Sequence, residues 1–302
     1  MHISNIVCNF AVEKNAYLRK KFYYMIQRPV YIKKLIERKN NGLIKVITGL
    51  RRSGKSILLS NLYHDYLRDS GIAEDHIIQI DLEDILQYEY RDPRTFLEYV
   101  YSKITDDSGY YLFVDEIQHL DQFEGVLNSL IKHRGVDVYV TGSNSKFLST
   151  DVITEFRGRG DEVRIYPLSF QEIVSSLPQD HINLEALFLD YMVYGGMPFL
   201  TTMKLPEQKE EYLKNLFKET YLKDIRDRYK IQNDSDLEEL IDVLASAVGS
   251  MQNPLTIQNT FRSVKKHSLS DDTIKLYLQY LEEAFLVEKS VRYDIKGRSY
   301  IS

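Results

Sequence analysis

Apolar runs and amphipathic stretches alternate along the first half of the chain. The apolar runs are short and rich in β-branched and aromatic side chains, which is typical of buried strands. The stretches between them repeat apolar side chains every three or four positions, as a helix with one buried face does. This alternation predicts an α/β unit in which helices cover both faces of a parallel sheet. The expected strands are 43–48, 75–81, 110–114, 136–141 and 161–166, and the expected helices are 30–39, 93–104 and 123–132. A further helix is expected after the first strand, with apolar positions Ile57, Leu58, Leu59 and Leu62.

The second half of the chain is predicted to be helical. An apolar stretch at 184–194 ends at Gly195-Gly196 with Pro198 beyond, which is a strong helix stop. Residues 206–229 carry one apolar stripe among charged side chains, which indicates a long amphipathic helix. Three helices and a terminal β-hairpin around a glycine turn then indicate a winged helix. These last elements are expected at 235–248, 256–266, 270–281, 285–293 and 299–301.

A glycine-rich turn joins the first strand to the helix that follows it. The turn fits the P-loop pattern G-x-x-x-x-G-K-[ST], in which glycines let backbone N–H groups face an anion and the helix dipole favours phosphate. Lys55 is expected to reach the β- and γ-phosphates, and the Ser56 hydroxyl to coordinate Mg²⁺. A chance match in a glycine-containing turn is the alternative, but the strand and helix context argues against it. The predicted nucleotide-binding residues are Gly49, Leu50, Arg51, Arg52, Ser53, Gly54, Lys55 and Ser56.

A second strand, at 110–114, runs directly into two acidic residues. Asp115 at the strand tip is placed to hold the Mg²⁺, as the corresponding acid of P-loop NTPases does. Glu116 is placed to act as general base on the attacking water. The alternative is an ordinary acidic helix start, which the helix dipole also favours. Beside a P-loop, the acid pair favours hydrolysis over nucleotide storage.

One strand lies between the P-loop strand and the Asp-Glu strand in the sequence. This order resembles the additional-strand class of P-loop ATPases, which includes the AAA+ proteins. The resemblance implies a polar sensor after the next strand, where Ser143 and Asn144 stand. An arginine near the γ-phosphate, from the same chain or a neighbouring one, stabilises the charge that develops in phosphoryl transfer. Arg157 and Arg159 are the best candidates for this role by position. The alternatives are a polar turn for the first pair and solvated charges for the second.

From about residue 25 onward, the chain resembles prokaryotic AAA+-like ATPases whose C-terminal half is a domain of uncharacterised function. The resemblance implies ATP and Mg²⁺ binding and, by the active-site pattern, hydrolysis, but no known client. We expect an N-terminal extension at 1–24, an ATPase core at 25–166, a helical connecting segment at 167–234 and a winged-helix domain at 235–302, with a truncated C-terminus left open. The motifs that carry the resemblance are Gln27-Arg28-Pro29, Thr48 to Ser56, Val114 to Gln118, Thr141 to Asn144, Arg157-Gly158-Arg159, Pro167 to Phe170, Tyr194 to Pro198 and Thr273 to Leu278.

Composition narrows the setting of the protein. The chain has 302 residues, of which 43% are hydrophobic and 27% charged, as in ordinary globular proteins. A net charge of −5 gives no overall attraction to nucleic acid or an anionic membrane. Cys8 is the only cysteine, which is consistent with a reducing compartment. No apolar run is long enough to span a bilayer, and basic residues follow rather than precede the apolar stretch at 3–12, so we expect a cytoplasmic protein without membrane association.

Three functions fit these observations. The first is an ATPase that binds ATP or ADP and uses hydrolysis to switch a protein partner. The second is a DNA-associated ATPase that binds duplex through the winged helix. Basic residues in the wing (Arg292, Lys296 and Arg298) favour it, whereas Asp271 and Asp272 at the start of the presumed recognition helix oppose it. The third is a nucleotide-binding scaffold without hydrolysis. The sequence leaves the client and the oligomeric state open.

Overall fold

The computed structural model describes residues 26–132, 135–142, 158–178, 182–231, 234–250, 253–265 and 269–290. These residues divide into two compact units, one up to Leu213 and one from Lys214. The boundary between the two units falls inside the long helical stretch at 206–229. The reason is that Lys209 and Tyr212 in the first part of this stretch contact residues 190 and 199 of the first unit, while its second part contributes to the core of the second unit.

The first unit alternates strands and helices over most of its length. Each predicted strand and helix forms within a few residues of its expected bounds. The strands are β1 (Ile44–Gly49), β2 (Ile77–Asp81), β3 (Tyr110–Asp115), β4 (Val136–Thr141) and β5 (Gly160–Ile165). The helices are α2 (Pro29–Arg38), α3 (Lys55–Ile57), η1 (Leu58–Tyr63), α4 (His64–Asp69), η2 (Glu74–His76), η3 (Ile85–Arg91), α5 (Pro93–Lys103), η4 (Ile117–His119), α6 (Phe123–Leu130), α8 (Phe170–Ser176), α9 (Leu184–Tyr194), η6 (Pro198–Thr202) and α10 (Pro206–Asn215).

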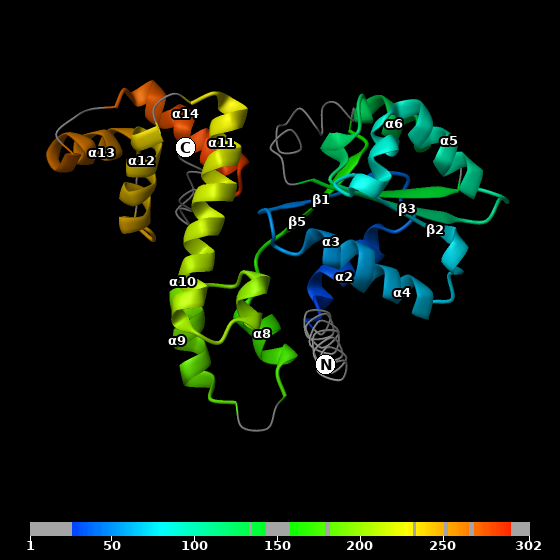
Figure 1. Ribbon diagram of the computed structural model, residues 1–302, viewed down its shortest axis with the longest axis horizontal. Coiled ribbons are helices and arrows are strands. Elements are labelled where there is room, and N and C mark those ends of the chain that lie inside the picture. The colour runs from blue at the N-terminus through cyan, green and yellow to red at the C-terminus, as the bar shows by residue number, and fades with distance from the viewer. Residues whose placement is uncertain are drawn as a thin grey trace, which may run out of the picture. The chain divides into compact units, whose positions relative to one another are not determined.

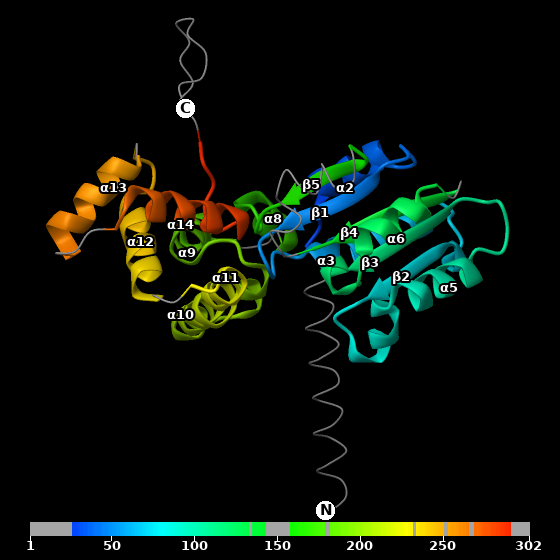
Figure 2. The same ribbon diagram turned by 90° about the horizontal axis from the view of Figure 1, so that it is seen from above.

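The five strands form one parallel sheet in the order β2-β3-β4-β1-β5. Figure 2 shows the strands side by side in this order. Strand β4 lies between the P-loop strand β1 and the Asp-Glu strand β3, which confirms the additional-strand arrangement that the sequence indicated. All strands point the same way, so β1 and β3 both end at one edge of the sheet. We call this edge the carboxyl edge.

Helices cover both faces of the sheet (Figure 1). Apolar side chains of α5 and α6, including Phe96, Val100 and Phe123, pack on one face. Helices α2, η1 and α4 cover the other face with Leu35, Leu58 and other apolar side chains. Burial on both faces explains why the strands read as continuous apolar runs and not as alternating patterns.

Helices α8 and α9 pack together with Ile26, which precedes α2. Leu168 and Ile173 bury apolar surface together with Ile26. The Leu168 N–H donates to the carbonyl of Gly196 across 2.7 Å. A Cβ at residue 196 would lie 1.9 Å from the Leu168 carbonyl oxygen, so only glycine fits there. Helix η6 follows directly, and its Pro198 ring would lie 3.8 Å from a Cβ at Gly54 of the P-loop.

The second unit is helical where it is described. Its helices are η7 (Leu216–Leu222), α11 (Lys223–Tyr229), α12 (Asp234–Ser246), α13 (Pro254–Thr260), η8 (Phe261–Lys265) and α14 (Asp271–Glu283). They enclose a core that includes Ile225, Leu240, Phe261 and Ile274. The three helices expected for a winged helix are therefore present. Residues 285–290 of the expected wing form no strand, and residues 291–302 lie outside the described residues. The winged helix stays a prediction. Within the described ranges, no helix is long and apolar enough to cross a membrane.

Candidate nucleotide-binding site

The P-loop leaves the carboxyl edge at the end of β1. Gly49 has φ of 139°, and a Cβ there would lie 2.2 Å from the carbonyl oxygen of Ile165 on β5. Gly54 has φ of 97° and immediately precedes α3. Both glycines are thus required by the backbone path, which brings the first turn of a helix to the end of a strand. The unpaired N–H groups of such a turn favour an anion.

Lys55 lies inside this loop and is almost completely buried, with 4% of its surface exposed. Its ammonium group donates to the carbonyls of Gly49 and Leu50 at 3.1 and 3.2 Å. Burial lowers the pKa of Lys55, and the carboxylates of Glu116 and Asp115 work against that shift. Two carboxylates thus stabilise the protonated form of the lysine, against the effect of its burial.

Asp115 ends β3 beside the start of α3. Its carboxylate accepts hydrogen bonds from the hydroxyls of Ser56 and Thr141. Burial raises the pKa of Asp115, and both hydroxyls oppose this rise because they stabilise the ionised form. The Ser56 hydroxyl and the Asp115 carboxylate are hard oxygen donors that touch each other. This pair fits Mg²⁺, which one or two protein oxygens and substrate phosphates usually hold.

Glu116 follows in a left-handed backbone conformation, with φ of 50°. Its N–H donates to Thr141 Oγ1 at 3.1 Å, and the Gln118 amide donates to its carboxylate. The side chain is 8% exposed. Thr141 thus holds both acids, through the carboxylate of one and the backbone of the other. The sequence showed Thr141 only as a strand end and gave it no role.

Lys55, Ser56 and Glu116 line a cavity of about 320 Å³ at the carboxyl edge. The cavity presents a buried lysine, a carboxylate and a hydroxyl that pairs with the Asp115 carboxylate, so its donor set fits a nucleotide phosphate chain with Mg²⁺. Residues of η6 and α10, far along the chain, close one side of it. The lining residues are Arg52, Gly54, Lys55, Ser56, Ile57, Glu116, Phe199 and Tyr212.

The remaining P-loop side chains point to different neighbours. Arg51 forms an ion pair with Glu83 at 2.9 Å. Arg52 has a left-handed backbone, is exposed and lines the cavity. Ser53 is buried, and its backbone carbonyl accepts a hydrogen bond from Arg28. Leu50 contributes its carbonyl to Lys55.

Of the predicted sensor and arginine residues, Arg159 is the one that the described part of the chain includes. Ser143, Asn144 and Arg157 lie outside the described residues. Arg159 immediately precedes β5, and its carbonyl accepts the N–H of Ile44 at the start of β1. It therefore lies at the amino edge of the sheet, opposite the P-loop. A role for Arg159 toward the nucleotide of its own chain does not fit this place, and a role toward a neighbouring chain stays a prediction.

Arg28 connects the P-loop to distant parts of the first unit, and sequence reasoning assigned it no role. Its guanidinium donates to the carbonyls of Ser53 and Tyr166 at 3.1 and 2.7 Å and to the carboxylate of Glu172 at 3.0 Å. The side chain also lies over the Tyr31 ring, 4.4 Å from its centroid. Its only signal in the sequence is its place in the Gln27-Arg28-Pro29 motif.

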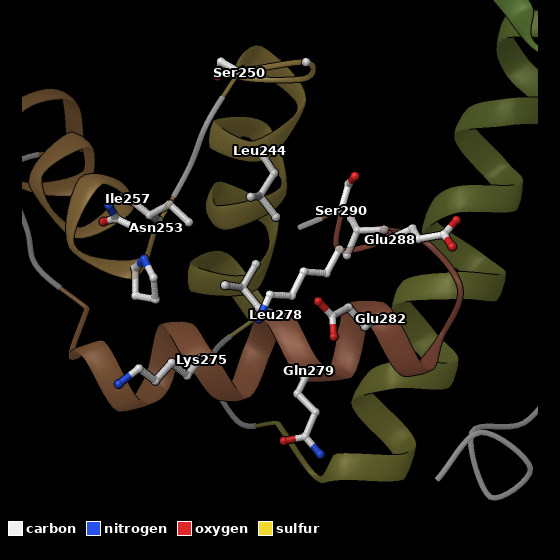
Figure 3. A pocket seen from close by; sticks show the side chains of 14 residues that line it. Leu244, Ser250, Asn253, Ile257, Lys275, Leu278, Gln279, Glu282, Glu288 and Ser290 are labelled. Carbon is white, nitrogen blue, oxygen red and sulfur yellow. The ribbon is translucent and has the colours of Figure 1, made fainter. Parts of the chain in front are cut away.

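The second unit has a larger hollow, of about 970 Å³, between α12, α13 and α14 (Figure 3). Leu244, Ile257 and Leu278 form much of its wall, with Lys275 and Glu282 on α14 among the polar groups. Lys275 pairs with Asp271 at 2.5 Å, which raises the pKa of the lysine. The described residues that line the hollow include no P-loop and no paired carboxylates, so its size does not make it the nucleotide site.

Comparison with known proteins agrees with this geometry. Residues 41–174 match the family described as an AAA domain, and residues 185–300 match a domain of unknown function. An uncharacterized protein of Haemophilus influenzae is 36% identical over 280 residues, which cover 92% of this chain and 69% of that protein. An uncharacterized protein of Methanocaldococcus jannaschii is 27% identical over 278 residues, which cover 87% of this chain and 58% of that protein.

Similarity to solved structures is weaker. The Aeropyrum pernix ORC1 protein in complex with DNA aligns with a TM-score of 0.38 and 12% identity over 88% of this chain and 86% of that one. Structural similarity at this level does not support a conclusion about function. The match to the Haemophilus influenzae protein along most of both chains, the AAA domain match and the P-loop at the sheet edge agree with one another. The chain therefore belongs to the family of AAA+-like P-loop ATPases that join an AAA domain to a C-terminal domain of unknown function.

Proposed function

We propose that this protein binds ATP with Mg²⁺, hydrolyses it and uses the cycle to switch a protein partner. One observation carries the proposal: Lys55, Ser56 and Glu116 line one cavity, and Asp115 pairs with Ser56 beside it, although β1 and β3 are not adjacent in the sheet. Each of these groups has a part in phosphoryl transfer.

Each residue has a distinct role in this proposal. Lys55 balances the charge on β- and γ-phosphate oxygens, and Ser56 with Asp115 holds Mg²⁺, which supplies charge neutralisation during transfer. The Glu116 carboxylate takes the proton of the attacking water as general base. Gln118 and Thr141 orient Glu116 through its carboxylate and its backbone.

The switch role rests on helix continuity. Helix α10 lines the cavity through Tyr212, and the helical stretch continues without interruption through η7 and α11 into the second unit. A change at the cavity wall is thus covalently connected to the second unit. A protein partner fits that unit better than duplex DNA, because Asp271 and Asp272 occupy the first turn of α14 and would repel phosphates there.

Two substitutions test binding and hydrolysis separately. Lys55→Ala should weaken ATP binding and nearly abolish turnover, while Glu116→Gln should keep ATP bound and block water activation. Lys33→Ala is the matched control, since this lysine lies on α2 with 77% of its side chain exposed. Calorimetry for binding and phosphate release for turnover give the result. Unchanged binding and turnover in a folded Lys55→Ala protein would refute the site.

The same measurements address the other functions. A protein that binds ATP in a Lys55-dependent way but releases no phosphate would be a nucleotide-binding scaffold. Gel shifts with a salt titration test the DNA-associated alternative. Tight, salt-sensitive duplex binding that is lost on charge reversal at Arg292, Lys296 and Arg298 would favour it over a protein partner.

A further inference from the structure

Tyr212 and Phe199 form the side of the nucleotide cavity opposite the P-loop. Their rings pack together, with centroids 5.3 Å apart and an angle of 49° between planes. Tyr212 belongs to α10 and Phe199 to η6, so both come from the region after the sheet. This pair is held near the loop by the close approach of Gly196 to Leu168.

The hydroxyl of Tyr212 is buried at this wall. Among the described residues no acceptor pairs with its O–H, although buried hydroxyls are almost always paired. Burial raises the pKa of this phenol, and the guanidinium of Arg52 opposes the shift by its charge and by donating toward the phenol oxygen, so Arg52 lies close to the ring's polar end and leaves the O–H hydrogen without an acceptor. The group is a neutral O–H donor at neutral pH, in a cavity to which a ligand has access.

The neighbours of this hydroxyl indicate what it would bind. The same cavity presents Arg52 and Lys55, both cations, together with the helix start at Ser56. A donor beside two cations is complementary to an acceptor that carries negative charge, and phosphate oxygens are such acceptors. A ribose or base would leave the cations facing a neutral group.

We propose that Tyr212 is a nucleotide-binding residue whose hydroxyl donates a hydrogen bond to the phosphate chain beside Arg52. This inference rests on the proposed function, because it assigns a residue of α10 to the same nucleotide. Its consequence is regulatory. Nucleotide binding fixes the position of α10 against the P-loop, and α10 is the helix that continues into the second unit.

Tyr212→Phe tests the contact because it removes one oxygen and keeps the ring that packs on Phe199. We expect a roughly tenfold weaker affinity for ATP by calorimetry, the size of one hydrogen bond to a charged group. Tyr194→Phe on α9 is the control, since its ring lies by Lys209 and outside the cavity lining. Arg52→Gln should weaken ATP binding as well, and its effect should not add fully to that of Tyr212→Phe.

Adenosine, which has the base and ribose but no phosphate, separates the phosphate chain from the rest of the nucleotide. An equal loss of affinity for adenosine in Tyr212→Phe would place the hydroxyl on the base or ribose and overturn the assignment. Hydrogen exchange supplies a second readout: ATP should protect residues 206–213 in the parent and protect them less in Tyr212→Phe. Unchanged ATP affinity in Tyr212→Phe, with binding still dependent on Lys55, would overturn this inference alone. A parent protein that binds no ATP would overturn the proposed function with it.

Discussion

Arg28 offers a strong test of how the fold supports the candidate site. The residue is 3% exposed and pairs with Glu172, which is itself part of the cap of α8. Arg28→Met would remove the guanidinium and leave the Glu172 carboxylate and the Ser53 and Tyr166 carbonyls without their donor. Breaking a buried ion pair from one side costs about 3–5 kcal/mol of folding free energy.

A matched control lies on the same N-terminal segment. Arg38 at the end of α2 pairs with Asp161 at 2.9 Å, but the two side chains are 29% and 21% exposed. Solvent screens this pair, so Arg38→Met should cost under about 1 kcal/mol. Urea unfolding of the two variants and the parent gives both values. Equal destabilisation by both substitutions would refute the idea that burial sets the cost.

Arg28 should also affect nucleotide binding. Its bond to the Ser53 carbonyl fixes the P-loop one residue before Gly54, so its loss frees the loop to leave the phosphate-binding conformation. The folded fraction of Arg28→Met should bind ATP about tenfold more weakly, the size of one such bond. Arg38→Met should bind like the parent. Arg28→Lys should not restore affinity, because one ammonium lacks the planar fork that serves three acceptors.

Two further substitutions test buried charges in the sheet. Asp137→Ala leaves Lys45 buried in β1 without its carboxylate partner. Urea unfolding should show that the free energy of unfolding falls by about 3–5 kcal/mol in Asp137→Ala and by less in Lys45→Met. Equal losses in the two variants would contradict the reasoning. Asp115→Asn should raise stability at pH 7 while it weakens Mg²⁺-ATP binding. Burial raises the pKa of Asp115 above that of the unfolded chain, so the folded parent loses stability as pH rises between the two values, and the variant's advantage should disappear at lower pH. A variant less stable than the parent at pH 7 would contradict this.

The sequence predicted the elements of the first unit because their signals are local. The strand at 136–141 and the helix at 184–194 form with the predicted bounds. The P-loop and the Asp-Glu pair were found for the same reason, since each follows a strand within a few residues. Parallel strands then bring such residues to one edge of the sheet whatever their distance along the chain.

Contacts between distant residues left no such signal. Arg28 and Glu172 are 144 positions apart, and neither sits in a periodic pattern that points to the other. Tyr212 appeared as one position of an amphipathic helix, and only the approach of α10 to the P-loop shows its place at the cavity. The position of Arg159 was within reach of sequence reasoning, however. It directly precedes a predicted parallel strand, and the start of such a strand lies at the edge opposite the P-loop.

The energetic costs at the cavity argue that its arrangement is selected for binding and is not a chance match to a motif. Arg52 and Glu116 hold left-handed backbones that cost non-glycine residues about 1–3 kcal/mol where they are strained. Lys55 and Asp115 are ionisable groups whose charged forms burial disfavours, and the Tyr212 O–H is buried without an acceptor among the described residues. Each cost falls on a group that faces the same 320 Å³ space or adjoins it. A phosphate chain with Mg²⁺ would offset these costs together, because it supplies anions to the cations and donor and a cation to the acids.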